Sequence, residues 1–222
     1  MWPPRTIVIT DRRALGARGD GEQEARLVAF VGASADAGVD AVQVRERDWA
    51  DARLLRVMRA AVAAVQGSGC HVFVNDRAHV AIAAGAHGVQ LRGDGMPAAR
   101  VRRVWPTELL IGRSVHVGDD VTMAEGADVV LFGTVFPSMS KGPAAPVAGV
   151  SALAAWARRP GMVPVVAVGG IDLDRCASVH ETGAAGVAGI DVFARAWHQG
   201  ASSLASMVRE IHAVFRDRER AE

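Results

Sequence analysis

Lysine is almost absent from this chain of 222 residues. Of its 25 lysine and arginine residues, only Lys141 is a lysine. Arginine presents a rigid planar fork of donors, whereas lysine places a compact, mobile charge that suits a phosphate or a reacting group. Lys141 follows an apolar run and lies in a segment of glycine, proline and small hydroxyl residues that includes Ser138 and Ser140. Two interpretations stay open here: a functional lysine, or a chance survivor of an arginine-rich composition.

Cysteine, excess charge and long apolar runs are also scarce, and each shortage excludes a class of protein. The two cysteines, Cys70 and Cys176, lie far apart in the sequence and do not have the spacing of zinc ligands, so we expect neither a disulfide framework nor a zinc site. We therefore expect the protein to be located in the reducing cytoplasm. A formal net charge of +1 gives no indication of a nucleic-acid or anionic membrane partner. No apolar run reaches the ~20 residues of a membrane span, and the N-terminus lacks a signal-peptide pattern, so we expect no membrane association.

Short β-branched runs recur along the chain and alternate with segments of helical periodicity. The apolar runs occupy residues 6–9, 41–44, 71–74, 88–91, 110–112, 129–132, 165–168 and 186–190. Helical spacing of apolar residues is found at 52–59, 99–104, 150–156 and 204–215. Strands that alternate with helices predict parallel βαβ units, and eight units without a break in composition predict one α/β domain over residues 1–222, a single (β/α)8 TIM barrel. An open sheet with fewer strands is the alternative.

Polar residues gather after the predicted strands rather than before them. In a TIM barrel the active site forms at the C-terminal ends of the strands, so this asymmetry indicates a catalytic face. Gly169 and Gly170 follow the seventh predicted strand and open a predicted helix, where backbone N–H groups can approach an anion. The loops after the last two strands are the usual phosphate site of such barrels, so we favour a phosphate here over a simple tight turn.

The second predicted strand runs into alternating polar residues, because Gln43, Arg45 and Arg47 share one face if the strand continues. Three such groups at a barrel mouth would hold an anionic or heteroaromatic ligand. The competing interpretation is a salt bridge from Arg45 or Arg47 to Glu46 or Asp48. We favour ligand binding for Arg45 and leave Arg47 open.

Two further strand ends carry groups with possible chemistry. Asn75 and Asp76 end the third strand, where Asp76 has the oxygen ligands that Mg²⁺ prefers but has the spacing of a helix N-cap, which is the commoner role. Ser114 and His116 follow the fifth strand, and histidine can both take and give a proton near neutral pH.

Taken together, these segments resemble the thiamine phosphate synthase/TenI superfamily of (β/α)8 barrels along nearly the whole chain. The segments that carry the resemblance are 43–47, 74–77, 88–91, 112–116, 131–137, 138–141 and 167–171. The resemblance implies one of two activities. A thiamine phosphate synthase joins hydroxymethylpyrimidine diphosphate to a thiazole phosphate with Mg²⁺. A TenI-type thiazole tautomerase aromatises a carboxythiazole phosphate with a histidine and no metal.

The chain departs from the synthase pattern at several positions. Arg47 replaces a lysine, Gln90 replaces a histidine, and Gly95 stands where synthases have a metal-binding aspartate, with Asp94 one residue early. The segment from Ser138 through Ser140 to Lys141 keeps the hydroxyls and the lysine of the synthase pyrophosphate loop. Asp191 stands where the family has a phosphate-binding serine, and a carboxylate there repels a phosphate unless it points away.

These departures favour the tautomerase, in which His116 transfers the proton, Ser114 and Arg45 orient the ring or the carboxylate, and no metal is needed. The implied phosphate site is formed by Gly169, Gly170, Gly189 and Ile190.

The alternative is the synthase, with Asp76 and Asp94 holding Mg²⁺ and with Arg45, Arg47 and Lys141 on the pyrophosphate. Gln43, Asn75, Ser138 and Ser140 are expected substrate contacts. A second alternative is a barrel that binds a phosphorylated heterocycle or a partner protein without turnover, and a homo-oligomer is implied by resemblance only.

Overall fold

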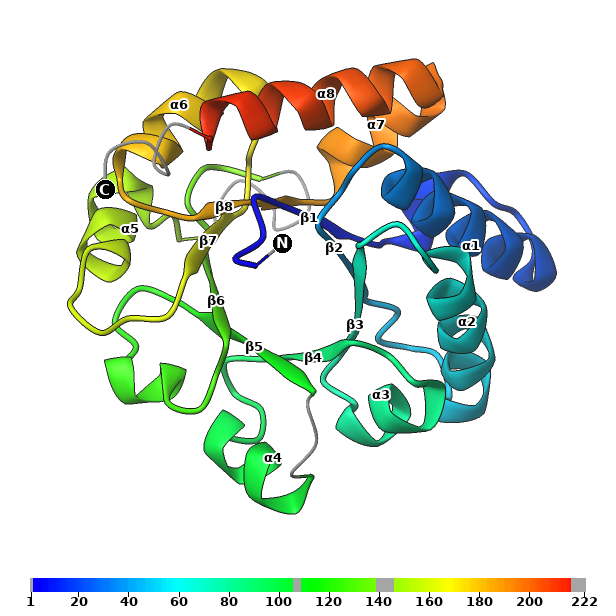
Figure 1. Cartoon of the computed structure of the whole chain (residues 1–222), viewed down its shortest axis with the longest axis horizontal. Helices are drawn as coiled ribbons and strands as arrows, with labels where there is room; N and C mark the ends of the chain where they lie inside the picture. Colours follow the sequence, from blue (N-terminus) through cyan, green and yellow to red (C-terminus); the bar gives the residue numbers. More distant parts are fainter. Residues whose placement is uncertain (1, 106–108, 139–145, 217–222) are drawn as a thin grey trace.

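The computed structural model describes residues 2–105, 109–138 and 146–216, and its strands form a closed barrel. Each strand pairs in parallel with its neighbours in sequence order, and the last pairs with the first, as Figure 1 shows end-on. The predicted (β/α)8 barrel is confirmed and the open sheet is excluded. The strands are β1 (Thr6–Ile9), β2 (Ala41–Val44), β3 (His71–Asn75), β4 (Gly88–Leu91), β5 (Leu110–Val115), β6 (Val129–Gly133), β7 (Val165–Val168) and β8 (Gly186–Gly189).

Helices surround this ring of strands (Figure 1). They are α1 (Asp20–Asp36), α2 (Asp51–Ala64), α3 (Ala78–Ala84), α4 (Ala98–Val104), α5 (Gly149–Ala157), α6 (Leu173–Glu181), α7 (Asp191–Gln199) and α8 (Ala201–Val214). In the described part of the chain, the connection from β5 to β6 holds only a short 3₁₀ helix, Val121–Ala124, and two α-helices follow β8. Among the described residues, no helix combines the length and the apolarity that crossing a bilayer would require.

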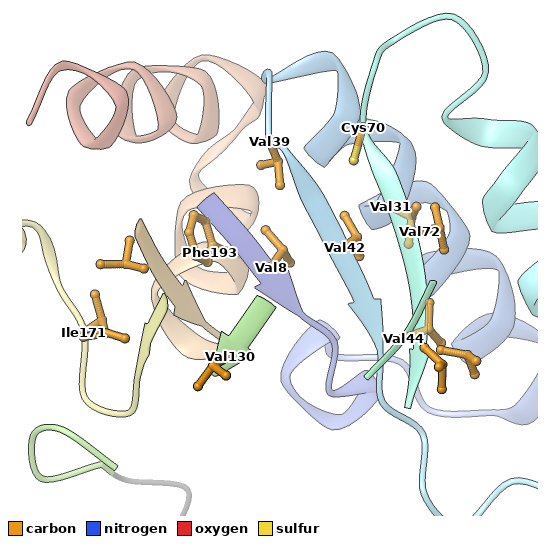
Figure 2. Packing of buried hydrophobic residues seen from close by; sticks show 14 of the residues in the cluster. Val8, Val31, Val39, Val42, Val44, Cys70, Val72, Val130, Ile171 and Phe193 are labelled. Carbon is orange, nitrogen blue, oxygen red and sulfur yellow. The ribbon is translucent and has the colours of Figure 1, made fainter. Parts of the chain in front are cut away.

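Alternation along the strands separates two hydrophobic cores. Outward side chains such as Val8, Val42 and Val72 pack against the helices in a large core that includes Phe193 of α7 (Figure 2). Inward side chains form a smaller core inside the barrel, which consists of Ile7, Ile9, Ala41, Phe73, Val129, Leu131, Val166 and Ala188. The barrel interior is thus filled with side chains, and only its ends can receive a ligand.

The N-terminal end of the barrel is closed by contacts within the chain. Trp2 stacks on Phe73 with 6.1 Å between ring centroids. Asp40 accepts hydrogen bonds from the backbone N–H groups of Arg5 and Thr6 and from the Thr6 hydroxyl, and lies 3.1 Å from His212 Nε2. Burial alone would raise the pKa of Asp40, but the hydrogen bonds from His212 and Thr6 lower it. These polar groups are engaged in joining α8 to β1.

At the opposite end, a buried carboxylate joins β1 to β2. Glu46, whose side chain is 1% exposed, accepts hydrogen bonds from the Thr10 hydroxyl (2.8 Å), the Arg12 backbone (3.1 Å) and the Arg12 guanidinium (2.8 Å). Arg12 also binds both oxygens of Asp48, and this hydrogen bonding raises the pKa of Arg12 and lowers the pKa of Asp48 to about 2. The Arg12 guanidinium lies 5.4 Å from the Trp49 ring centre, which further fixes it.

Removal of the buried carboxylate tests this connection. Glu46→Ala leaves the Thr10 hydroxyl and one side of Arg12 without their acceptor, so we expect the free energy of unfolding to fall by about 3 kcal/mol. The matched control is Glu22→Ala, which removes an exposed pair with Arg26 and should cost less than about 1 kcal/mol. Urea unfolding followed by circular dichroism measures both, and equal losses would contradict the structural role of Glu46.

Candidate functional site

The C-terminal ends of the strands enclose a cavity of about 1080 Å³. Most of the residues predicted from the sequence line it, namely Gln43, Arg45, Arg47, Asn75, Asp94, Ser114, His116, Ser138, Gly169, Gly170, Gly189 and Ile190. Asp76 lines a smaller adjoining pocket of about 390 Å³, which shares Arg47, Asn75 and Arg92 with the large one. Ser140 and Lys141 lie outside the described residues, so their roles stay predictions.

The floor of the cavity is a layer of amides and one hydroxyl on β2 to β5. The Gln43 amide donates to Asn75 Oδ1 (3.0 Å), and the Gln90 amide donates to Ser114 Oγ (3.1 Å). Gly112 makes this possible, because a Cβ there would overlap the Gln90 side chain. Gln43 Oε1 is buried without a hydrogen-bond partner. An orphaned acceptor beside a cavity costs stability unless a ligand donor reaches it, so the floor is suited to a ring that carries N–H groups.

Arg45 and Arg47 reach this cavity without a carboxylate partner among the described residues. The competing interpretation from the sequence, a salt bridge to Glu46 or Asp48, does not occur, since Arg12 binds both of those carboxylates. Burial, together with the nearby charge of Arg47, lowers the pKa of Arg45. Asp11 and Glu46 oppose this lowering, but neither forms an ion pair with Arg45 or Arg47, so the two guanidinium groups can attract an anion.

The glycine pair after β7 is required by both conformation and space. Gly169 and Gly170 have φ values of +99° and +64°, which favour glycine. A Cβ on Gly170 would overlap the Pro137 carbonyl oxygen. Phe136 N–H donates to the Gly169 carbonyl (3.0 Å), which holds the segment after β6 against this turn. The two glycines therefore let the segment after β6 pack closely against this turn, and the anion site that the sequence predicted here stays a prediction.

Asp191 is the first residue of α7 and lines the cavity. Arg195 lies one helical turn later and also lines the cavity. Both a carboxylate and a guanidinium thus line the cavity near the loop of Gly189 and Ile190, and the repulsion of a phosphate by Asp191 stays a prediction.

Ser114 and His116 are fixed by different partners. Ser114 Oγ accepts from Gln90 at the floor, whereas His116 lies at the rim with its side chain 52% exposed. The His116 backbone N–H donates to Asp119 Oδ2 (2.8 Å), and the His116 Nδ1 atom lies 3.5 Å from the same oxygen. His116 can therefore meet a ligand, but the structure shows no hydrogen bond that joins it to Ser114.

The carboxylates proposed for Mg²⁺ do not form a two-carboxylate site. Asp76 does not cap α3, which begins after Arg77, and instead lies 3.7 Å from a guanidinium nitrogen of Arg92. Asp94 binds that same guanidinium through both of its oxygens. A Cβ on Gly95 would lie 2.8 Å from Asp76 Oδ1, so residue 95 is the position from which a second ligand would reach Asp76, and it has no side chain. Within the described ranges, no three His, Cys, Asp or Glu residues are placed to hold a metal ion. The donor set does not fit the magnesium site that the resemblance implies.

Arg113 is a positioning residue that the sequence did not reveal. It is 2% exposed and points outward from β5, and its guanidinium donates to the carbonyls of Gly93 (2.8 Å) and Met96 (2.9 Å). Burial lowers the pKa of Arg113, and its Nε has no hydrogen-bond partner. No local pattern indicates this role, since its partners lie on another strand's loop. Arg113 thereby fixes the loop that carries Arg92, Asp94 and Gly95.

Comparisons with known proteins agree on one family. Residues 8–193 match the family model TMP-TENI, described as thiamine monophosphate synthase. A putative thiamine-phosphate synthase of Geobacter sulfurreducens is 38% identical over 82% of each chain. The thiamine-phosphate synthase of Roseiflexus sp. is 35% identical over 94% of this chain and 84% of that protein.

A comparison with solved structures agrees with this family. A thiamine phosphate pyrophosphorylase from Pyrococcus furiosus superposes with a TM-score of 0.77 at 29% identity, covering 96% of each chain. A 3-hexulose-6-phosphate synthase with a TM-score of 0.62 is only 19% identical, so it shows the barrel fold alone.

The role of Arg113 can be tested by exchanging it for a neutral side chain of similar length. Arg113→Met removes the donors of the 93–96 carbonyls, so we expect these loop amides to exchange faster with solvent by about tenfold and stability to fall by about 1–2 kcal/mol. Hydrogen exchange with mass spectrometry measures the loop. Arg100→Met on the exposed side of α4 is the control, and unchanged exchange in both variants would contradict the assignment.

Proposed function

The chain belongs to the thiamine phosphate synthase/TenI family, and from this membership we propose that it is a thiamine phosphate synthase. This transferase would join a hydroxymethylpyrimidine diphosphate to a thiazole phosphate and release pyrophosphate. The named relatives above are synthases, which favours this reaction over the thiazole tautomerase that the departures in the sequence favoured.

The observation that carries the proposal is the pair of arginines without an acid partner. A diphosphate brings several negative charges, and Arg45 and Arg47 supply the charge-assisted donors that its oxygens accept. The single phosphate of a tautomerase substrate is already provided for by the loops after β7 and β8. A tautomerase substrate also carries a carboxylate, but two guanidinium groups match the several charges of a diphosphate better than the single charge of a carboxylate.

The size and layout of the cavity agree with two substrates. Its volume of about 1080 Å³ lies just above the range of about 300–1,000 Å³ usual for single small ligands. In the closed ring, β7 and β8, which precede the glycine loops, lie across from β3 and β4, whereas β2, which precedes Arg45 and Arg47, is separated from β8 only by β1 (Figure 1). The thiazole phosphate would occupy Gly169, Gly170, Gly189 and Ile190, and the diphosphate would occupy Arg45 and Arg47, with Ser138, Ser140 and Lys141 as further proposed contacts.

The chemistry needs orientation and charge stabilisation more than proton transfer. The bond between the pyrimidine methylene carbon and the diphosphate oxygen breaks, and its electron pair leaves on pyrophosphate. The lone pair of the thiazole nitrogen forms the new carbon–nitrogen bond, so no proton has to move. Arg45 and Arg47 stabilise the charge on the departing diphosphate, while Gln43 and Asn75 orient the pyrimidine ring through their amides. Mg²⁺ is implied by the resemblance, but no step is assigned to it, because the donor set does not fit.

A second candidate keeps one specific observation in its favour. His116 lies at the cavity rim beside Asp119, as a proton-transferring group would, so thiazole tautomerisation stays a testable alternative.

Product formation tests the proposal. We expect the purified chain, given both substrates, to form thiamine phosphate and pyrophosphate in equal amounts, measured by chromatography. Arg45→Ala should lower kcat/KM about 100-fold, because a charge-assisted contact to the leaving group is lost. Arg59→Ala, on the exposed face of α2, is the control. Absence of thiamine phosphate from the wild-type chain would refute the synthase.

His116 separates the two activities. We expect His116→Ala to change the rate of thiamine phosphate formation less than about tenfold, since no proton is transferred. Isomerisation of a carboxythiazole phosphate, followed by NMR, should be no faster with the wild-type chain than with this variant. A wild-type isomerisation rate that falls 100-fold or more in His116→Ala would instead establish the tautomerase.

A further inference from the structure

Arg92 occupies the place at the barrel mouth where a divalent cation would be expected to bind. It follows β4 directly and lines both the large cavity and the smaller pocket. Its Nε donates to Asp94 Oδ1 (2.9 Å), a terminal nitrogen binds the other oxygen of Asp94, and the remaining nitrogen lies 3.7 Å from Asp76 Oδ2. The guanidinium is therefore held between the two carboxylates, with its side chain 42% exposed.

The charges around this place favour an anion over a cation. Arg47 and Arg113 both act electrostatically on the Asp94 carboxylate, and Arg113 also acts on Asp76. Asp119 acts on Arg113 more strongly than Asp76 or Asp94 does, so Arg113 adds no free charge here. Arg47, which forms no ion pair among the described residues, is the positive group left for an anion. A cation brought to Asp76 would be repelled by the guanidinium of Arg92, which is already near that carboxylate.

Asp94 also prepares Arg92 for a ligand. Binding through Nε and one terminal nitrogen fixes the plane of the guanidinium and engages one edge of its fork. The other terminal nitrogen lies 3.7 Å from Asp76 Oδ2, too far for a hydrogen bond, so its N–H groups stay available to an anion in the pocket that Arg92 shares with Arg47. Arg113 fixes the loop beneath by binding the carbonyls of Gly93 and Met96.

We propose that Arg92, oriented by Asp94 and assisted by Arg47, binds the diphosphate group in the place of a magnesium ion. This inference rests on the proposed synthase function for its substrate, and it makes diphosphate binding independent of a divalent cation. Arginine carries a permanent charge and planar donors that match phosphate oxygens. A guanidinium supplies positive charge at this position without the second carboxylate that Gly95 lacks.

Calorimetric titration of the full chain with inorganic pyrophosphate tests this directly, because it needs no turnover. We expect binding in EDTA to be no weaker than binding in Mg²⁺. Arg92→Ala should weaken binding in EDTA by at least tenfold. Arg56→Ala is the matched control, since Arg56 also binds an acid, Glu24, through a bidentate contact but lies on α2 outside the cavity, and it should change nothing. Binding that requires Mg²⁺, or that survives Arg92→Ala, would overturn the proposal.

A second variant exchanges the guanidinium for a carboxylate and tests whether the chain then binds a divalent cation. Arg92→Gly combined with Gly95→Asp removes the guanidinium and returns a carboxylate to the position beside Asp76. We expect this variant to bind Mn²⁺, detected by electron paramagnetic resonance, and to bind pyrophosphate only with a divalent cation, while the wild-type chain binds Mn²⁺ at least tenfold more weakly. Equal Mn²⁺ binding by both chains would contradict the inference, and an unchanged circular dichroism spectrum confirms that the variant is folded.

The outcomes separate this inference from the proposed function. Thiamine phosphate formed only with Mg²⁺, together with tight Mn²⁺ binding by the wild-type chain, would refute the role of Arg92 and keep the synthase. Pyrophosphate bound through Arg92 without any thiamine phosphate formed would refute the synthase and keep the anion site.

Discussion

Arg12 binds Glu46 and Asp48, the two carboxylates on either side of Arg47, and the electrostatics of the barrel mouth depend on this contact. If Glu46 or Asp48 were free, Arg45 and Arg47 would neutralise them and leave no charge for a ligand. Because Arg12 comes from the neighbouring strand end, the acids are satisfied from the side and both arginines stay directed to the cavity. The ion pairs of Arg12 with Glu46 and Asp48 thus leave Arg45 and Arg47 without a carboxylate partner.

A second group of paired charges lies after β4. Asp94 and Asp76 both face Arg92, and Arg113 holds the loop beneath them from the outside of the barrel. The barrel therefore presents positive charge on its β2 to β4 side and glycine-rich backbone on its β7 and β8 side. A floor of amides lies between them. In the proposed synthase, this arrangement would hold the diphosphate and the monophosphate at separate places and bring their rings together, as a condensation of two phosphorylated substrates requires.

The sequence predicted the barrel well because its signals are local. The eight apolar runs and the helical periods between them define parallel βαβ units without any tertiary information. The alternation of Gln43 and Arg45 and the pair Gly169–Gly170 were correctly placed at the mouth for the same reason.

Partners across strands could not be predicted: the contact of Arg12 with Glu46, the bond between Gln90 and Ser114, and the support from Arg113 all join distant segments. Asp94 looked like a displaced metal ligand because its spacing, but not its pairing with Arg92, can be read from sequence. Lys141 began as a compositional oddity and remains a predicted pyrophosphate contact outside the described residues.

In the proposed binding mode, arginines at the strand ends, rather than a metal ion between carboxylates, receive the diphosphate. A crystal structure of the chain with pyrophosphate and Mn²⁺, with anomalous scattering collected for manganese, tests it most directly. If arginines receive the diphosphate, we expect pyrophosphate within hydrogen-bond distance of Arg92 and Arg47 and no anomalous peak at Asp76. A manganese peak bound to Asp76 and bridging to the pyrophosphate would contradict it.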